Sequence, residues 1–170
     1  MKKLFTILAC AAAMVACEND EIVRQDLGDA IEFNSFVENS TRATDPSYSN
    51  KDIAAFKVYG TVNNVLIFDD ATVTKNDEYG KAWAVTDALG SAIKQYWIPS
   101  ATYKFVGIVD GQKENVTKTN FDGNKMPTTV EYTADGATDL LCQTIDYTAW
   151  SAEDLANGKS NPIVGFNFSH

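Results

Sequence analysis

The chain has 170 residues, with 23 acidic against 14 basic side chains and a formal net charge of −9 at pH 7. This length is enough for one domain with a hydrophobic core, and the acidic balance excludes nucleic acid and anionic lipid headgroups as electrostatic partners.

The N-terminus has the pattern of an export signal peptide. Lys2 and Lys3 give it a positive start, residues 4–15 are apolar, and Ala16 is a small residue before Cys17. The apolar stretch is too short to span a membrane, and a cysteine after the small residue forms a bacterial lipobox. We therefore predict cleavage before Cys17 and acylation of its thiol. At about 0.8 kcal/mol for each buried methylene, three acyl chains hold a protein firmly on a membrane.

The pattern divides the chain into three parts. Residues 1–16 are the signal peptide, residues 17–29 are an acidic tether, and residues 30–170 are the folded domain. Removing the signal with its two lysines changes the formal charge from −9 to −11. Because the chain stops directly after an expected strand, we expect it to be the N-terminal part of a longer, two-domain protein.

Short strands recur along the domain at intervals of about ten residues, which is typical of an all-β sandwich. The clearest one has Phe56, Val58 and Gly60 on one face and Lys57 and Tyr59 on the other. The strands expected from such alternation are residues 30–37, 53–62, 65–68, 71–74, 82–85, 95–99, 103–109, 128–133, 139–143 and 163–168. The fold class predicted is an antiparallel β-sandwich of about seven to ten short strands.

The segments between these strands carry weaker signals. Asp69-Asp70 indicates a turn, and the polar residues 38–50 indicate an exposed loop. One helical turn is expected between a capping Ser151 and a terminating Gly158. Cys142 is expected to be a small buried residue of a strand.

Catalytic signals are weak. The single histidine is the last residue, so a serine or cysteine triad is not expected, and no cysteine or histidine spacing fits zinc. We predict no catalytic residue, metal or cofactor, and a hydrolase is only a third alternative. The acidic pairs that calcium could use are interpreted as solvated; they are Asp69-Asp70, Asp77-Glu78 and Glu153-Asp154.

Aromatic side chains give an alternative function. Trp83 and Trp97 lie within strand-period segments and are expected in the core. Trp150 lies in a loop-like stretch, so with Tyr147 it is a possible ligand contact. The alternative is therefore an outer-membrane-anchored, glycan-binding lipoprotein.

The order of these features resembles the fimbrillin-like lipoproteins of Bacteroidetes, the subunits of surface fimbriae, over their N-terminal domain. Acidic residues directly after the lipobox also resemble the signal that places Bacteroidetes lipoproteins on the outer face of the outer membrane. The segments that carry the resemblance are Cys17, Ile31 to Val37, Ser40-Thr41-Arg42-Ala43, Phe56 to Gly60, Tyr96 to Pro99, Lys104 to Gly107, Asp139 to Leu141 and Ile163 to His170.

The resemblance implies a mechanism of fimbria assembly and adhesion. A trypsin-like protease would cut between Arg42 and Ala43 and release the first strand together with the lipid. Another subunit would then fill the groove by donor-strand addition. The displaced strand would carry Ile31, Phe33, Phe36 and Val37. The implied partners are outer-membrane lipid, other fimbrial subunits and a host surface or glycan.

Overall fold

The computed structural model describes residues 29–37, 53–76, 83–109, 116–133 and 140–168. These residues form nine strands and one short helix, which confirms the predicted all-β class. The elements are β1 (Phe33–Val37), β2 (Ala55–Val62), β3 (Val65–Thr74), β4 (Ala84–Thr86), β5 (Thr102–Val109), β6 (Val116–Phe121), β7 (Pro127–Tyr132), β8 (Leu141–Thr148), α1 (Ala152–Ala156) and β9 (Val164–Phe168).

Five strands form a central antiparallel sheet in the order β4-β3-β2-β5-β8. The alternation along β2 sets its two faces as the sequence predicts: Phe56 and Val58 belong to the main core, and Tyr59 belongs to a smaller cluster on the opposite face. The sheet therefore buries apolar side chains on both sides.

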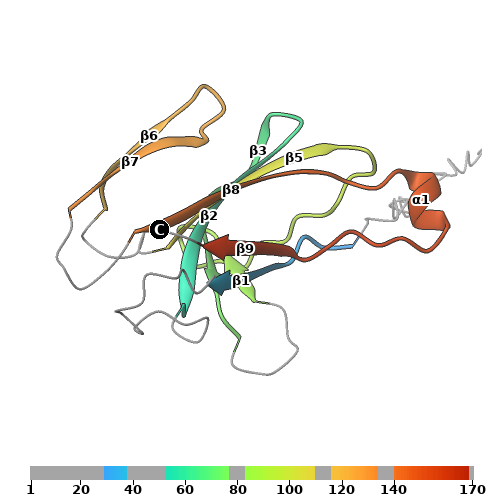
Figure 1. The fold of residues 1–170 in the computed structure, drawn as a ribbon, viewed down its shortest axis with the longest axis horizontal. Coiled ribbons are helices and arrows are strands. Elements are labelled where there is room, and N and C mark those ends of the chain that lie inside the picture. The colour runs from blue at the N-terminus through green and yellow to red at the C-terminus, as the bar shows by residue number, and fades with distance from the viewer. Residues whose placement is uncertain (1–28, 38–52, 77–82, 110–115, 134–139, 169–170) are drawn as a thin grey trace, which may run out of the picture.

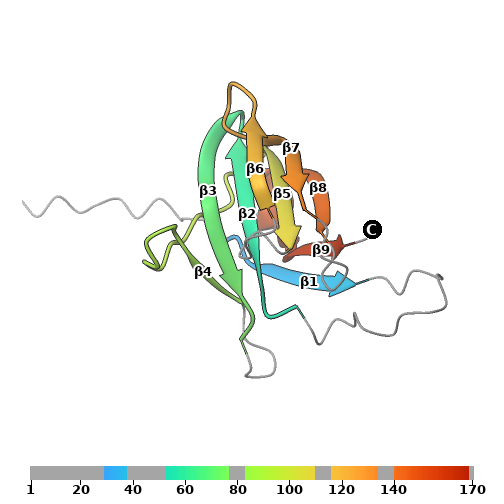
Figure 2. The same ribbon diagram turned by 90° about the vertical axis from the view of Figure 1, so that its left-hand side faces the viewer.

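Each face of the central sheet is covered by a pair of strands. Figure 1 shows β1 and β9 on one face and the β6–β7 hairpin on the other. In Figure 2, β1 and β9 run across the strands of the central sheet. The pair β1–β9 is parallel, so the prediction of purely antiparallel pairing was wrong at this place. Parallel neighbours need a long connection, and here almost the whole domain connects them.

The main core lies between the central sheet and β1–β9, and it is rich in aromatic rings. Phe33, Phe105 and Phe166 are each at most 1% exposed. Gly107 of β5 makes room for β9, because a Cβ atom there would lie 2.7 Å from a ring carbon of Phe166. The second cluster, under the hairpin, is built from fewer side chains: Tyr59, Val106, Ile108 and Met126, with Leu66, Val130 and Leu140 at its margin.

Asp69-Asp70 does not form the predicted turn. β3 continues through both residues, and the register against β2 shifts between Val58 and Gly60. Asp70 has a positive φ of 52° there, so the irregularity is absorbed as a bulge rather than a chain reversal.

The predicted strand at residues 95–99 is also absent, and only an isolated bridge joins Tyr96 to Ala30. The hydroxyl of Tyr103 accepts a hydrogen bond from the Ile98 N–H at 2.6 Å and donates to the Tyr96 carbonyl at 3.2 Å. A side chain therefore uses backbone groups that a sheet ladder would need. Trp97 is 2% exposed, which confirms its expected place in the core.

The C-terminal third follows the sequence signals more closely. The Ser151 hydroxyl caps α1 by accepting from the Asp154 N–H at 3.1 Å, and Gly158 follows the helix with a φ of 87°. Cys142, however, is exposed, so its predicted burial was wrong. Leu141 takes the inward position in β8, and its neighbour therefore points to the other face.

Candidate functional site

The candidate site is β1 together with the core that receives it. β1 pairs with β9 from Phe33 opposite Val164 to Val37 opposite Phe168. The Glu32 carbonyl extends this pairing by accepting from the Val164 N–H at 2.8 Å. Among the described residues, β9 is the only strand that pairs with β1.

The residues before β1 dock on the irregular segment that replaces the predicted strand. The Ile31 N–H donates to the Gln95 carbonyl at 2.8 Å, and the Trp97 N–H donates to the Asp29 carbonyl at 3.1 Å. The chain is therefore fixed by two backbone contacts before it reaches β9.

Side chains alternate along this segment as the sequence predicts. Ile31 is 5% exposed and Phe33 is 1% exposed, so both point into the core. The ring of Phe33 lies edge-on to Phe68 at 5.3 Å and to Phe105 at 5.6 Å between centroids. A third ring, Phe166, stacks at 6.2 Å. Without β1, these three rings would border an apolar groove.

The other two residues of the expected displaced strand, Phe36 and Val37, belong to β1. Their side chains are outside what the structure describes, as are Cys17, Arg42 and Ala43.

Sequence reasoning missed the polar atoms of β1. Ser35 is 6% exposed, and neither its hydroxyl nor the Asn34 Oδ1 atom has a hydrogen-bond partner in the described part of the chain. A buried polar group without a partner costs about 1–3 kcal/mol. β1 therefore combines a well-packed aromatic anchor with two poorly satisfied polar groups. The signal in the sequence that could have revealed them is Ser35, a serine at an inward position of a strand with alternating side chains.

β9 holds the opposite side of the site. Val164, Phe166 and Phe168 alternate along the strand and point into the core. The Asn167 N–H donates to the Gln143 side chain at 2.5 Å, so a residue of β8 reaches toward this strand.

The two aromatic candidates for ligand binding face different surroundings. Tyr147 is half-buried and its ring lies 5.1 Å from that of core residue Trp97. Trp150 is 38% exposed, and the Lys159 ammonium lies 4.1 Å from its ring centroid. The structure does not bring these two side chains together as one aromatic platform.

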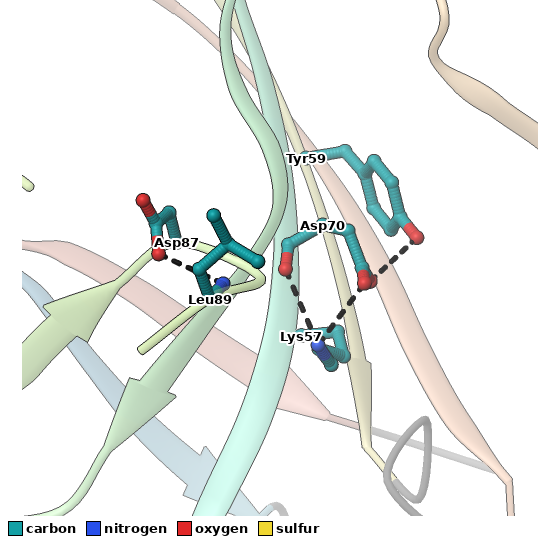
Figure 3. Close-up of polar contacts among 5 residues, drawn as sticks. All are labelled: Lys57, Tyr59, Asp70, Asp87 and Leu89. Carbon is teal, nitrogen blue, oxygen red and sulfur yellow. Dashed lines mark hydrogen bonds and ion pairs between the residues drawn. The ribbon is translucent and has the colours of Figure 1, made fainter. Parts of the chain in front are cut away.

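Most carboxylates of the described acidic pairs form hydrogen bonds or ion pairs with other side chains of the protein. Figure 3 shows Asp70 accepting from the Tyr59 hydroxyl at 2.9 Å and from the Lys57 ammonium at 3.1 Å. Burial, and then the hydrogen bond to Asp70, raise the pKa of Tyr59. Asp69 pairs with Lys125 at 3.3 Å. These contacts fix the bulge of β3 between β2 and the hairpin.

The remaining acids give no metal centre within the described ranges. Asp154 pairs with Lys159 at 2.8 Å, and the carboxylate of Asp87 accepts from the Leu89 N–H at 2.9 Å to form a local turn (Figure 3). No group of three or more possible metal ligands occurs among the residues that were placed. Asp77-Glu78 lies outside them.

Comparisons with protein-family models, curated proteins and solved structures find no match to this chain. Within the described residues, no helix has the length and apolar character needed to cross a bilayer.

Proposed function

We propose that this chain is a surface lipoprotein of the fimbrial-subunit type, anchored through Cys17 in the outer membrane and acting in fimbria assembly and adhesion by strand exchange. In this proposal, cleavage after Arg42 separates β1 from the rest of the domain, and a strand from another subunit takes its place. The chain performs no catalysis of its own.

The observation that carries the proposal is the character of β1. It pairs with one described strand only, yet it inserts Phe33 among three core rings. Fully burying a side chain of this size contributes about 1.5–3 kcal/mol, so an empty groove would be unstable and would favour a replacement strand.

The unpartnered atoms of Asn34 and Ser35 would favour replacement of β1 by a strand that lacks them. A donor strand with an aromatic residue at the Phe33 position and an apolar residue at the Ser35 position would keep the ring contacts and avoid the buried hydroxyl. Such a donor would bind more tightly than β1 itself.

Arg42 is suited to the cut by its sequence context. It lies between β1 and β2 in a stretch rich in Ser, Thr, Asn and Asp, which is the kind of segment a protease accepts. Cleavage there breaks the covalent link of β1 to the sheet and leaves only its hydrogen bonds and side-chain contacts.

The test is cleavage followed by strand capture. The full chain is treated with a trypsin-like protease, its fragments are weighed by mass spectrometry, and a labelled peptide with the sequence of residues 29–37 and Ser35→Val is added. We expect a fragment starting at Ala43 and peptide binding only after cleavage.

Two matched controls make this test specific. Arg42→Ala should block both the fragment and the capture, and a peptide with Phe33→Ser should not bind. Cleavage at Arg42 without any capture of the first peptide would contradict strand exchange.

A further inference from the structure

Three of the six large apolar side chains that are exposed in the described residues lie on segments that backbone hydrogen bonds connect to the start of the described chain. They are Ile98, Trp150 and Ile163, at 52%, 38% and 51% exposure, and we call them the exit patch. In Figure 1, the coil that leads into β1 begins at the end of the domain that carries α1.

Backbone hydrogen bonds place each member of the exit patch next to this point. Ile98 follows Trp97, whose N–H donates to the Asp29 carbonyl at 3.1 Å. Ile163 precedes Val164, whose N–H donates to the Glu32 carbonyl at 2.8 Å.

Trp150 is joined to the same region through its backbone. The Ser100 N–H donates to the Trp150 carbonyl at 3.1 Å, and the Trp150 N–H donates to the Asn161 side chain at 3.1 Å. These bonds hold the tryptophan between the segments that carry Ile98 and Ile163.

The length of chain before this point limits what can cover the patch. Even when fully extended, the segment from Cys17 to Asp29 reaches about 40 Å. If Cys17 is acylated, as proposed above, the bilayer is held at a high effective concentration beside the domain. The end of the domain from which the tether leaves is then the end that meets the lipid.

The chemistry of the patch fits the interface of a bilayer. Tryptophan prefers the boundary between headgroups and acyl chains, where its ring is buried and its N–H remains solvated. The Lys159 ammonium, which lies over the Trp150 ring, is paired with Asp154 at 2.8 Å, so its charge is compensated within the protein. Ile98 and Ile163 supply further exposed apolar area.

We propose that the exit patch is a membrane-contacting surface, which seats the anchored domain on the bilayer that holds its acyl chains. This inference rests on the proposed lipid anchor. Contact through one end would fix the orientation of the domain on the bilayer.

The test uses the full chain from its own host, weighed intact to establish acylation of Cys17. The protein is placed in phosphatidylcholine vesicles with either ordinary or brominated acyl chains, and tryptophan fluorescence is compared. Zwitterionic lipid is chosen because the acidic domain is repelled by anionic headgroups. We expect bromine to quench part of the emission of the three tryptophans.

Variants assign the quenching to the patch. Trp150→Phe leaves Trp83 and Trp97 and should abolish the difference between the two kinds of vesicle. Ile98→Asn with Ile163→Asn should reduce it, because two apolar contacts are lost. Val65→Asn is the matched control, since Val65 is 64% exposed but lies outside the patch, and it should leave the quenching unchanged.

The outcomes separate this inference from the function on which it rests. An acylated protein with equal fluorescence in both vesicles overturns the membrane contact and leaves the lipoprotein proposal standing. A third outcome is emission of equal intensity in both kinds of vesicle, but at a shorter wavelength than that of a solvent-exposed Trp150. It would mean that residues 18–28 cover the patch instead of lipid, which also overturns the membrane contact. A chain that still contains residues 17–42 but carries no acyl chains overturns both.

Discussion

The two faces of the central sheet are covered in different ways. On one face, β1 and β9 place Phe33 and Phe166 against Phe105 in a closed aromatic core. On the other, the β6–β7 hairpin covers a smaller cluster and leaves a groove of about 310 Å³. The groove is lined by Val106, Ile108, Pro127, Thr128, Thr129, Val130, Leu140, Cys142, Gln143 and Thr144.

This difference between the β1–β9 pair and the β6–β7 hairpin indicates under which condition β1 can be exchanged. The strand that we propose to be removed lies on the tightly packed face, so its loss alone would destabilise the domain severely. Exchange can therefore only be a replacement of one buried aromatic strand by another. The hairpin covers the smaller cluster, so its displacement would expose fewer buried apolar side chains.

The largest expected effect is a truncation on the β1 face. Phe33→Ala should lower the free energy of unfolding by about 3–5 kcal/mol, because the cavity lies among three rings that cannot collapse easily. Urea unfolding followed by tryptophan fluorescence measures it. Met126→Ala, on the hairpin face, should lie near the low end of the range for such truncations, at about 2 kcal/mol. Equal losses would remove the contrast between the two faces.

Two glycine-to-alanine substitutions, one under β9 and one at the hairpin turn, test the same difference in packing by adding a methyl group. In Gly107→Ala the new methyl would meet ring carbons of Phe166 at 2.7 and 2.8 Å, so a loss of about 1–3 kcal/mol is expected. In Gly123→Ala, at the hairpin turn, the new methyl would meet nothing within 4 Å, so a change below about 0.5 kcal/mol is expected. Thermal and urea unfolding of both variants would give the comparison, and an unaffected Gly107→Ala protein would contradict close packing of β9.

Alkaline pH should weaken the hairpin face through Tyr59. Its pKa is raised in the folded state by burial and by Asp70, so the folded protein keeps a proton that the unfolded chain loses above its ordinary pKa of 10.0. Stability from this group is complete below pH 10 and falls above it, by roughly 1 kcal/mol at about pH 11. Tyr59→Phe should flatten that part of the stability profile in urea titrations at several pH values, whereas an unchanged slope would argue against this origin.

The smallest expected effect is a gain. Ser35→Ala removes a buried hydroxyl that has no partner in the described part of the chain, and should stabilise the domain by about 1 kcal/mol. Thr144→Ala, at an exposed position on β8, serves as the control and should be neutral within about 0.5 kcal/mol. A destabilised Ser35→Ala protein would show that the hydroxyl is satisfied after all.

Period-two alternation predicted which side chains of the site share a face. Ile31 and Phe33 share one face of their strand, and both are buried, because alternation depends only on neighbours along the strand. It could not predict that β1 lies parallel to β9, since pairing depends on which distant strands meet.

Local signals failed where side chains compete with the backbone ladder. Asp70 indicated a turn, but Lys57 and Tyr59 on the neighbouring strand bind its carboxylate and hold it in a bulge. Tyr96 and Ile98 alternated like a strand, yet the Tyr103 hydroxyl takes their backbone groups. Both outcomes depend on residues from another strand, which a reading along the chain does not include.

The parallel pairing of β1 with β9 has a consequence for how the domain is made. The first described strand hydrogen-bonds to the last one, so the aromatic core cannot close until nearly the whole domain is available. Such distant pairings slow folding, because the entropy of a long loop is lost before the contact rewards it. During synthesis, β1 therefore has no strand to pair with until β9 has been made. The topology that closes the native core thus also delays its formation until the C-terminal strand is available.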